Sequence, residues 1–159
     1  MKIKLLCIGK LKEKYYAEAA AEFQKRLARY CSLEIIELPD EKAPENLSPL
    51  QKEQIKKAEG ERLLSHVGSC EFAIALMIEG EKLSSEKFAE KMDGWMNSGK
   101  SGICFMVGGS LGLSVEARNR ADFILSFSDM TFTHQMFRIM LLEQVYRAFK
   151  IIRNETYHK

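Results

Sequence analysis

The chain has 159 residues, of which 46% are hydrophobic and 29% are charged, and its formal net charge is +2. This composition excludes a disordered chain and a fibrous repeat, and a chain of this length buries about two-thirds of the surface that its unfolded form exposes. We therefore expect one domain over residues 1–159. No apolar stretch is long enough to span a bilayer, so we expect no membrane partner.

The charges are unevenly distributed along the chain. Residues 1–30 carry eight Lys or Arg against three Glu, and residues 134–159 carry five against two, whereas the middle carries eleven against seventeen acids. If the two ends meet in space, they form one cationic face, a modest electrostatic footprint for nucleic acid. Two ordinary solvated helix faces explain the same distribution, so both interpretations stay open.

The four cysteines, at positions 7, 31, 70 and 104, are widely spaced and form no C-x-x-C pair. A thiol in an apolar run behaves as a small hydrophobic group, so we expect reduced cysteines and a cytoplasmic protein. Structural zinc sites use close pairs of ligands, which these cysteines do not provide. We therefore expect no metal.

Apolar runs and helical periodicity alternate along the chain. They predict strands at 3–9, 33–38, 71–78, 103–109 and 121–128. They predict helices at 15–30, at 49–65, from Ser84 or Ser85 to 95, after Ser114, and at 134–152. Residues 79–83 are predicted to form a turn, and Ser48 with Gln51 is typical of a capping box. Alternating strands and helices indicate an α/β fold in which helices flank a parallel sheet.

The final predicted helix is unusually apolar. Twelve of the seventeen residues at 136–152 are apolar, which exceeds the single stripe that a core-facing helix needs. We therefore expect a second buried face and a homodimer that packs through this helix.

Three segments follow predicted strands, where parallel sheets place their ligands. They are "ALMIEG", "MVGGSLGLS" and "SFSDMTFTHQ". The glycine turn of the second segment lacks the G-x-G-x-x-G spacing and the Lys of a phosphate-binding loop, so dinucleotide binding and nucleotide hydrolysis lose support. Taken alone, the third segment is an ordinary strand-to-helix loop.

The chain ends in Tyr157, His158 and Lys159, which carry a phenol, an imidazole and an ammonium group. Chain ends are usually loosely held polar tails, so this terminus is either a solvated tail or a functional element. Nothing in the local pattern decides between the two.

Several segments together resemble one known family over the whole chain. These are "IGKLKEKYY", "PDEKAPEN", "VGGSLGL", "LSFSDMTFTHQMFRIMLLEQVYRAFKI" and the terminal "YHK". They resemble the ribosomal RNA large subunit methyltransferase H family of the SPOUT superfamily. The resemblance implies a SPOUT-type sheet with a C-terminal trefoil knot and a homodimer. It also implies S-adenosylmethionine-dependent methylation of N3 of a pseudouridine in helix 69 of 23S rRNA, in the assembled ribosome.

The resemblance also assigns site residues. The cofactor pocket of the family falls on Leu76, Gly108, Phe127, Ser128, Asp129, Met130, Thr131 and Phe132. This chain departs from many members at Thr133, where they have Pro, and at Met77, where they have an acid.

The terminal residues receive catalytic roles as a hypothesis, because pseudouridine N3 must lose its proton before it accepts a methyl group. His158 is the proposed proton acceptor, and Tyr157 stacks on the base or forms a hydrogen bond with it. Lys159 and Arg147 steady phosphate or developing charge.

Two other classes of protein stay open. One is a ribosome-binding module without catalytic activity, and the other is a small-molecule enzyme that uses the same glycine-lined pocket. The complete YHK terminus disfavours the first, and the basic ends disfavour the second.

Overall fold

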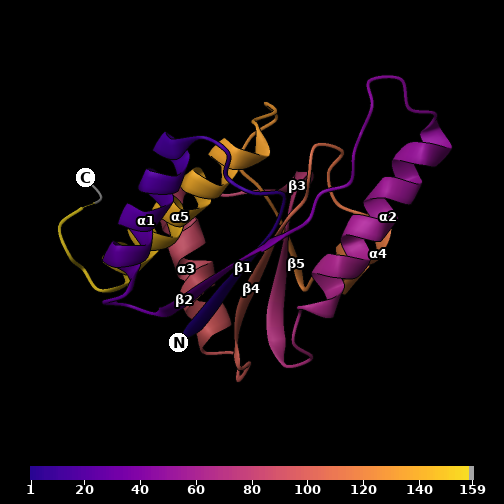
Figure 1. The fold of residues 1–159 in the computed structure, drawn as a ribbon. Coiled ribbons are helices and arrows are strands. Elements are labelled where there is room, and N and C mark those ends of the chain that lie inside the picture. Colours follow the sequence, from indigo (N-terminus) through magenta and orange to yellow (C-terminus); the bar gives the residue numbers. More distant parts are fainter. Residues whose placement is uncertain (158–159) are drawn as a thin grey trace.

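The computed structural model describes residues 1–157, in which strands and helices alternate (Figure 1). In chain order the elements are β1 (Lys2–Ile8), α1 (Lys14–Leu27), β2 (Ser32–Leu38), α2 (Pro49–Ser65), β3 (Glu71–Lys82), α3 (Ser85–Met96), β4 (Gly102–Val107), α4 (Val115–Arg120), β5 (Phe123–Ser126) and α5 (His134–Ile152).

The five strands form one parallel sheet in the order β2-β1-β4-β3-β5, which confirms the α/β prediction. Helices α1, α3 and α5 cover one face, and α2 and α4 cover the other (Figure 1). Successive side chains of a strand point to opposite faces. Leu5 and Cys7 of β1 therefore pack in the core under α1, α3 and α5, and Leu6 and Ile8 pack in the core under α2 and α4.

Side-chain caps start α2, α3, α4 and α5, whereas Glu13 at the start of α1 forms no side-chain cap. The Ser48 hydroxyl accepts a hydrogen bond from the main chain of Gln51, whose side chain accepts one from the Ser48 N–H, and this confirms the capping box. Ser84, rather than Ser85, caps α3, and Ser114 caps α4. Thr133 caps α5 by accepting a hydrogen bond from Met136 N–H.

The turn predicted at 79–83 is wrong in part, because β3 continues to Lys82. Leu76 and Glu81 both pair with Leu125 of β5, and residues 77–80 form an irregularity between them. A Cβ on Gly80 would lie 2.5 Å from the carbonyl carbon of Leu125, so strands β3 and β5 approach too closely for any side chain at position 80. The polar sequence indicates a turn, but pairing with β5 decides the conformation. The trefoil knot stays a prediction.

Helix α5 finds apolar partners within its own chain. Its inner face is buried, and α1 and α3 pack along its two sides (Figure 1). The rings of Phe23 and Tyr146, for example, lie 6.4 Å apart. The apolar excess of this helix therefore does not by itself require a second chain, although Ile139 and Met140 remain half-buried. The same packing places the basic N-terminal helix beside the basic C-terminal helix.

A buried ion pair joins β1 and β3 near the points where these two strands begin. Lys4 Nζ lies 2.9 Å from Glu71 Oε1, and both residues are buried. The ammonium also donates to the carbonyl of His66, and the main-chain N–H of Gly68 donates to the carboxylate. Hydrogen bonds therefore surround both charges, as burial of an ion pair requires.

Replacing Lys4 with Ala is expected to lower the free energy of unfolding by about 3–5 kcal/mol, because it leaves the Glu71 carboxylate buried without its partner. Urea unfolding measures the loss. The matched control is Lys2→Ala, which breaks the exposed pair with Glu34 and should cost about 1 kcal/mol or less. Equal losses in the two variants would contradict the stabilising role of the buried pair.

The same pair predicts a pH dependence. Burial alone would raise the pKa of Glu71, but the hydrogen bonds from Lys4 and Gly68 outweigh it, and the pKa lies below its usual value. A depressed pKa contributes stability above the unfolded value of about 4.3, and that stability is lost as pH falls through the folded pKa. The loss of folding stability that Glu71 causes as pH falls should therefore be smaller in Lys4→Ala than in the unaltered protein.

Candidate functional site

The three loops singled out in the sequence meet at one edge of the sheet. Strands β4, β3 and β5 are neighbours, with Ala75 opposite Met106 and Leu76 opposite Leu125. Because the strands are parallel, their carboxyl ends lie together, which is where open α/β sheets bind ligands. Leu76, Gly108 and Phe127 therefore stand at the same edge on three adjacent strands.

The turn after β4 is built from main chain in close contact. A Cβ on Gly108 would lie 2.6–2.9 Å from main-chain atoms of Gly112 and Leu113. Gly112 has a φ of +85°, a conformation that favours glycine, and its N–H donates to the carbonyl of Gly109. The close packing of Gly108 therefore closes this turn, residues 108–112, and leaves residues 109–112 partly or fully exposed at the sheet edge.

The loop from Phe127 to Phe132 is anchored at its ends and open in its middle. Phe127 stacks on Phe137 of α5 with ring centroids 4.9 Å apart, and Phe132 lies 6.4 Å from the same ring. Between them, Asp129 forms an exposed ion pair with Lys82, and Met130 is 72% exposed.

Local hydrogen bonds shape the same loop. The Ser126 hydroxyl donates to the carbonyl of Ser128, and the Ser128 hydroxyl accepts from Met130 N–H. Thr131 is exposed. The loop therefore offers main-chain groups and one apolar side chain to solvent while the two phenylalanines hold its position.

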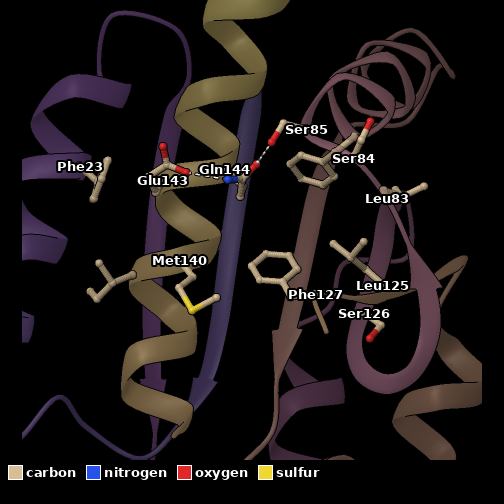
Figure 2. Close-up of a pocket in the computed structure, with 12 residues that line it drawn as sticks. Phe23, Leu83, Ser84, Ser85, Leu125, Ser126, Phe127, Met140, Glu143 and Gln144 are labelled. Atoms are coloured by element: carbon tan, nitrogen blue, oxygen red, sulfur yellow. Dashed lines mark hydrogen bonds between the residues drawn. The ribbon is translucent and has the colours of Figure 1, made fainter. Parts of the chain in front are cut away.

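A cavity of about 420 Å³ lies between α3, α5 and the end of β5 (Figure 2). Its walls are mainly apolar, with Leu83, Phe88, Leu125, Ile139 and Met140 among them. Of the eight residues that the sequence assigns to the cofactor, Phe127 lines this cavity, and the other seven do not. The cavity and the loop edge are therefore neighbours that share Phe127.

A row of hydrogen bonds runs along the polar side of the cavity. The Ser85 hydroxyl donates to Gln144 Oε1 at 2.8 Å, and the Gln144 amide donates to Glu143 Oε2 at 2.7 Å (Figure 2). Glu143 Oε1 then accepts from Arg147 Nη2 at 2.6 Å and from the Tyr157 hydroxyl at 3.1 Å. Glu143 thus joins two of the predicted catalytic residues to the cavity that Phe127 lines.

The surroundings of Tyr157 and Arg147 raise the pKa of both residues. Burial and the nearby Glu143 raise the pKa of Tyr157, and the hydrogen bond with Glu143 raises the pKa of Arg147. The guanidinium of Arg147 lies 4.7 Å from the centre of the Tyr157 ring. At neutral pH Tyr157 is therefore a hydrogen-bond donor and Arg147 a fixed cation. His158 and Lys159 lie outside the described residues.

Glu143, Gln144 and Ser85 are site residues that sequence reasoning missed. A signal exists for Glu143, because it precedes Arg147 by four positions in a mainly apolar helix, and such pairs meet on one helix face. Ser85 and Gln144 are 59 positions apart, and no local pattern predicts their contact.

Residues 1–157 contain neither a cluster of metal ligands nor a membrane-spanning helix. No group of three or more His, Cys, Asp or Glu in this range is arranged to hold a metal ion. None of its helices combines the length and the apolar character needed to cross a membrane. Burial raises the pKa of both Cys7 and Cys104 to about 12, so these thiols stay protonated and unreactive.

The fold is that of an α/β protein with a candidate ligand site at the carboxyl edge of a parallel sheet. A family model described as "Predicted SPOUT methyltransferase" matches residues 1–158. The chain belongs to the SPOUT methyltransferase family.

Similar proteins carry a more specific name. The chain is 51% identical to "Ribosomal RNA large subunit methyltransferase H" of Acetivibrio thermocellus, over 100% of both chains. It is 54% identical to "Ribosomal RNA large subunit methyltransferase H 1" of Clostridium perfringens strain SM101, again over 100% of both. Among solved structures, a probable methylase family protein from Haemophilus influenzae Rd KW20 has a TM-score of 0.55 at 16% identity, covering 99% of this chain and 70% of that one. This last likeness concerns the fold alone.

Proposed function

We propose that the protein methylates N3 of a pseudouridine in helix 69 of 23S rRNA, in the assembled ribosome, with S-adenosylmethionine as methyl donor. The observation that carries this proposal is the 51–54% identity, over complete chains, to enzymes named ribosomal RNA large subunit methyltransferase H. We further propose one domain over residues 1–159, a trefoil knot at its C-terminal end and a cytoplasmic location.

The residues at the sheet edge fit S-adenosylmethionine, which supplies an electrophilic methyl group when it is bound. Gly108 is itself buried against Gly112 and Leu113, and the part of the turn that a ligand can reach lies at residues 109–112. Leu76 is an apolar residue that is 8% exposed, and Phe127 presents a half-exposed ring. Flat apolar surfaces beside main-chain polar groups suit a ligand with an aromatic base and a charged tail. We assign its binding to Leu76, Gly108 and residues 127–132.

The terminal residues and Arg147 act on the acceptor base. His158 takes the N3 proton, because an imidazole titrates near neutral pH. Tyr157, held by Glu143 and protonated, donates a hydrogen bond or packs against the base. Lys159 and Arg147 supply positive charge, and the pairing with Glu143 holds the Arg147 guanidinium in place. Placement and proton removal are all that the chain must add to an electrophilic methyl group.

The protein acts as a homodimer in this proposal. Ile139 and Met140 of α5 and Phe23 of α1 are half-buried apolar residues around the cavity beside α5. Packing a second chain over them would remove this apolar surface from water. The ribosome is its second partner, because the basic helices α1 and α5 lie side by side.

Transfer of a labelled methyl group from S-adenosylmethionine to purified ribosomes tests the function. We expect label in the large-subunit RNA of ribosomes that carry pseudouridine in helix 69. We expect no label when the same position holds unmodified uridine. Ribosome binding without any label would indicate a non-catalytic module. Donor consumption without label in rRNA would indicate a small-molecule enzyme.

A further inference from the structure

Glu59 of α2 is a carboxylate buried beneath the glycine turn at residues 108–112. The residue is 4% exposed, and its Oε1 accepts a hydrogen bond from Glu41 N–H at 3.0 Å. Its Oε2 lies 2.9 Å from the position that a Cβ on Gly109 would occupy. Within residues 1–157 no donor reaches Oε2. One side chain therefore contacts both the loop at 39–48 and the glycine turn.

Helix packing holds Glu59 in this place. A Cβ on the next residue, Gly60, would lie 2.2 Å from the Ser114 hydroxyl, so α2 rests closely against the start of α4. Ser114 directly follows the glycine turn in sequence and caps α4. The close contact of Gly60 with Ser114 therefore holds α2 against the residue that follows the turn, with the Glu59 carboxylate beside Gly109.

A charged carboxylate is an unfavourable choice if only folding matters. Burial raises the pKa of Glu59, and the charge of Asp40 adds to it, while the Glu41 N–H and Arg62 oppose the shift. Buried polar atoms almost always have a partner, and exceptions gather at functional sites. An apolar or amide side chain would fill the same space without an unpaired oxygen. The unpaired Oε2 is therefore the feature of this buried side chain that its folding contacts leave unexplained.

We infer that Glu59 is a positioning residue for the glycine turn, whose Oε2 accepts a main-chain N–H from residues 109–111 when the methyl donor binds. The inference rests on the proposed function, which places the donor at this turn. Oε1 holds the loop at 39–48 and Oε2 holds the turn, so donor binding and ordering of that loop are linked. Glu59 acts through the turn and does not touch the donor.

Glu59→Gln tests the inference, because an amide has one acceptor oxygen and the role needs two. Whichever way the amide is turned, either the Glu41 N–H or the turn N–H faces its NH₂ group. Calorimetry should show affinity for S-adenosylmethionine weakened about tenfold, the effect of losing one hydrogen bond. The melting temperature without donor should equal or exceed that of the unaltered protein. In methyl transfer, the KM for S-adenosylmethionine should rise while kcat stays nearly unchanged.

The control is Glu61→Gln, an exposed position on the same helix, which should change neither affinity nor melting. Unchanged donor affinity in Glu59→Gln would overturn this inference but not the proposed function. It would mean that Oε2 carries a proton, which the NH₂ group of the amide replaces. A lowered melting temperature without donor would show a purely structural role. If the unaltered protein does not bind S-adenosylmethionine, the proposed function fails and this inference with it.

Hydrogen exchange gives a second readout that does not depend on activity. In the unaltered protein, donor binding should slow amide exchange both at 108–113 and at 39–48, because Glu59 connects them. In Glu59→Gln, donor binding should slow exchange at the turn only. Protection of both segments in the variant would contradict the link.

Discussion

Replacing His158 with Ala is expected to slow methyl transfer about a hundred- to ten-thousand-fold while leaving the fold and donor binding nearly unchanged. A group that accepts a proton in the rate-limiting step is typically worth this much, whereas a lost contact at a chain end is worth a few-fold at most. Single-turnover transfer to saturating ribosomes measures the chemical step without the binding step. Calorimetry with S-adenosylmethionine measures donor binding in the same variant.

The control for this variant is His66→Ala, which removes an exposed imidazole at the end of α2 and should have no effect on transfer. Tyr157→Phe removes the hydroxyl that donates to Glu143 and keeps the ring against Arg147. We expect a smaller loss of transfer rate in Tyr157→Phe than in His158→Ala, because Tyr157 positions the acceptor base whereas His158 accepts the proton. Near-normal single-turnover rates in His158→Ala would mean that another group removes the N3 proton.

Replacing Gly108 is expected to weaken binding of S-adenosylmethionine about a hundred-fold or more. Even a methyl group at this position would overlap the main chain of Gly112 and Leu113, so the turn must move, and a displacement on the order of 1 Å costs this much in a positioned site. Gly108→Ala and Gly108→Arg should both show the loss by calorimetry. The proposed homodimer, measured by light scattering, should persist in both variants.

Gly94→Ala is the matched control, because a Cβ there meets nothing within 4 Å. Gly94 lies inside α3, where alanine is favoured over glycine by roughly 1 kcal/mol, so the control should melt slightly higher and bind the donor normally. Unchanged donor binding in Gly108→Arg would place the donor elsewhere in the molecule.

These two variants together decide which subunit the tail serves. A mixed dimer of Gly108→Arg and His158→Ala carries one intact pocket and one intact tail, on different chains. If each tail serves its partner's pocket, the mixed dimer recovers part of the transfer activity. If each tail serves its own pocket, the mixed dimer stays inactive.

The sequence by itself determined the local elements and the position of the loops. The capping box at Ser48 and Gln51 and the bounds of α5 agree with the structure, because caps and helical hydrogen bonds join residues within about four positions of one another. Alternation of apolar strands and amphipathic helices was likewise sufficient for a parallel sheet. The site assignments at Leu76, Gly108 and residues 127–132 came from family resemblance and stay proposals.

Only the tertiary structure decided which distant groups meet. Strand order brought β4, β3 and β5 together, and pairing with β5 continued β3 through residues whose polar composition indicates a turn. The contact of Glu59 with Gly109, and the row from Ser85 to Glu143, join side chains from different elements. No local pattern encodes such contacts, because they depend on how whole elements pack, and this packing is set by burial of apolar surface across the entire chain.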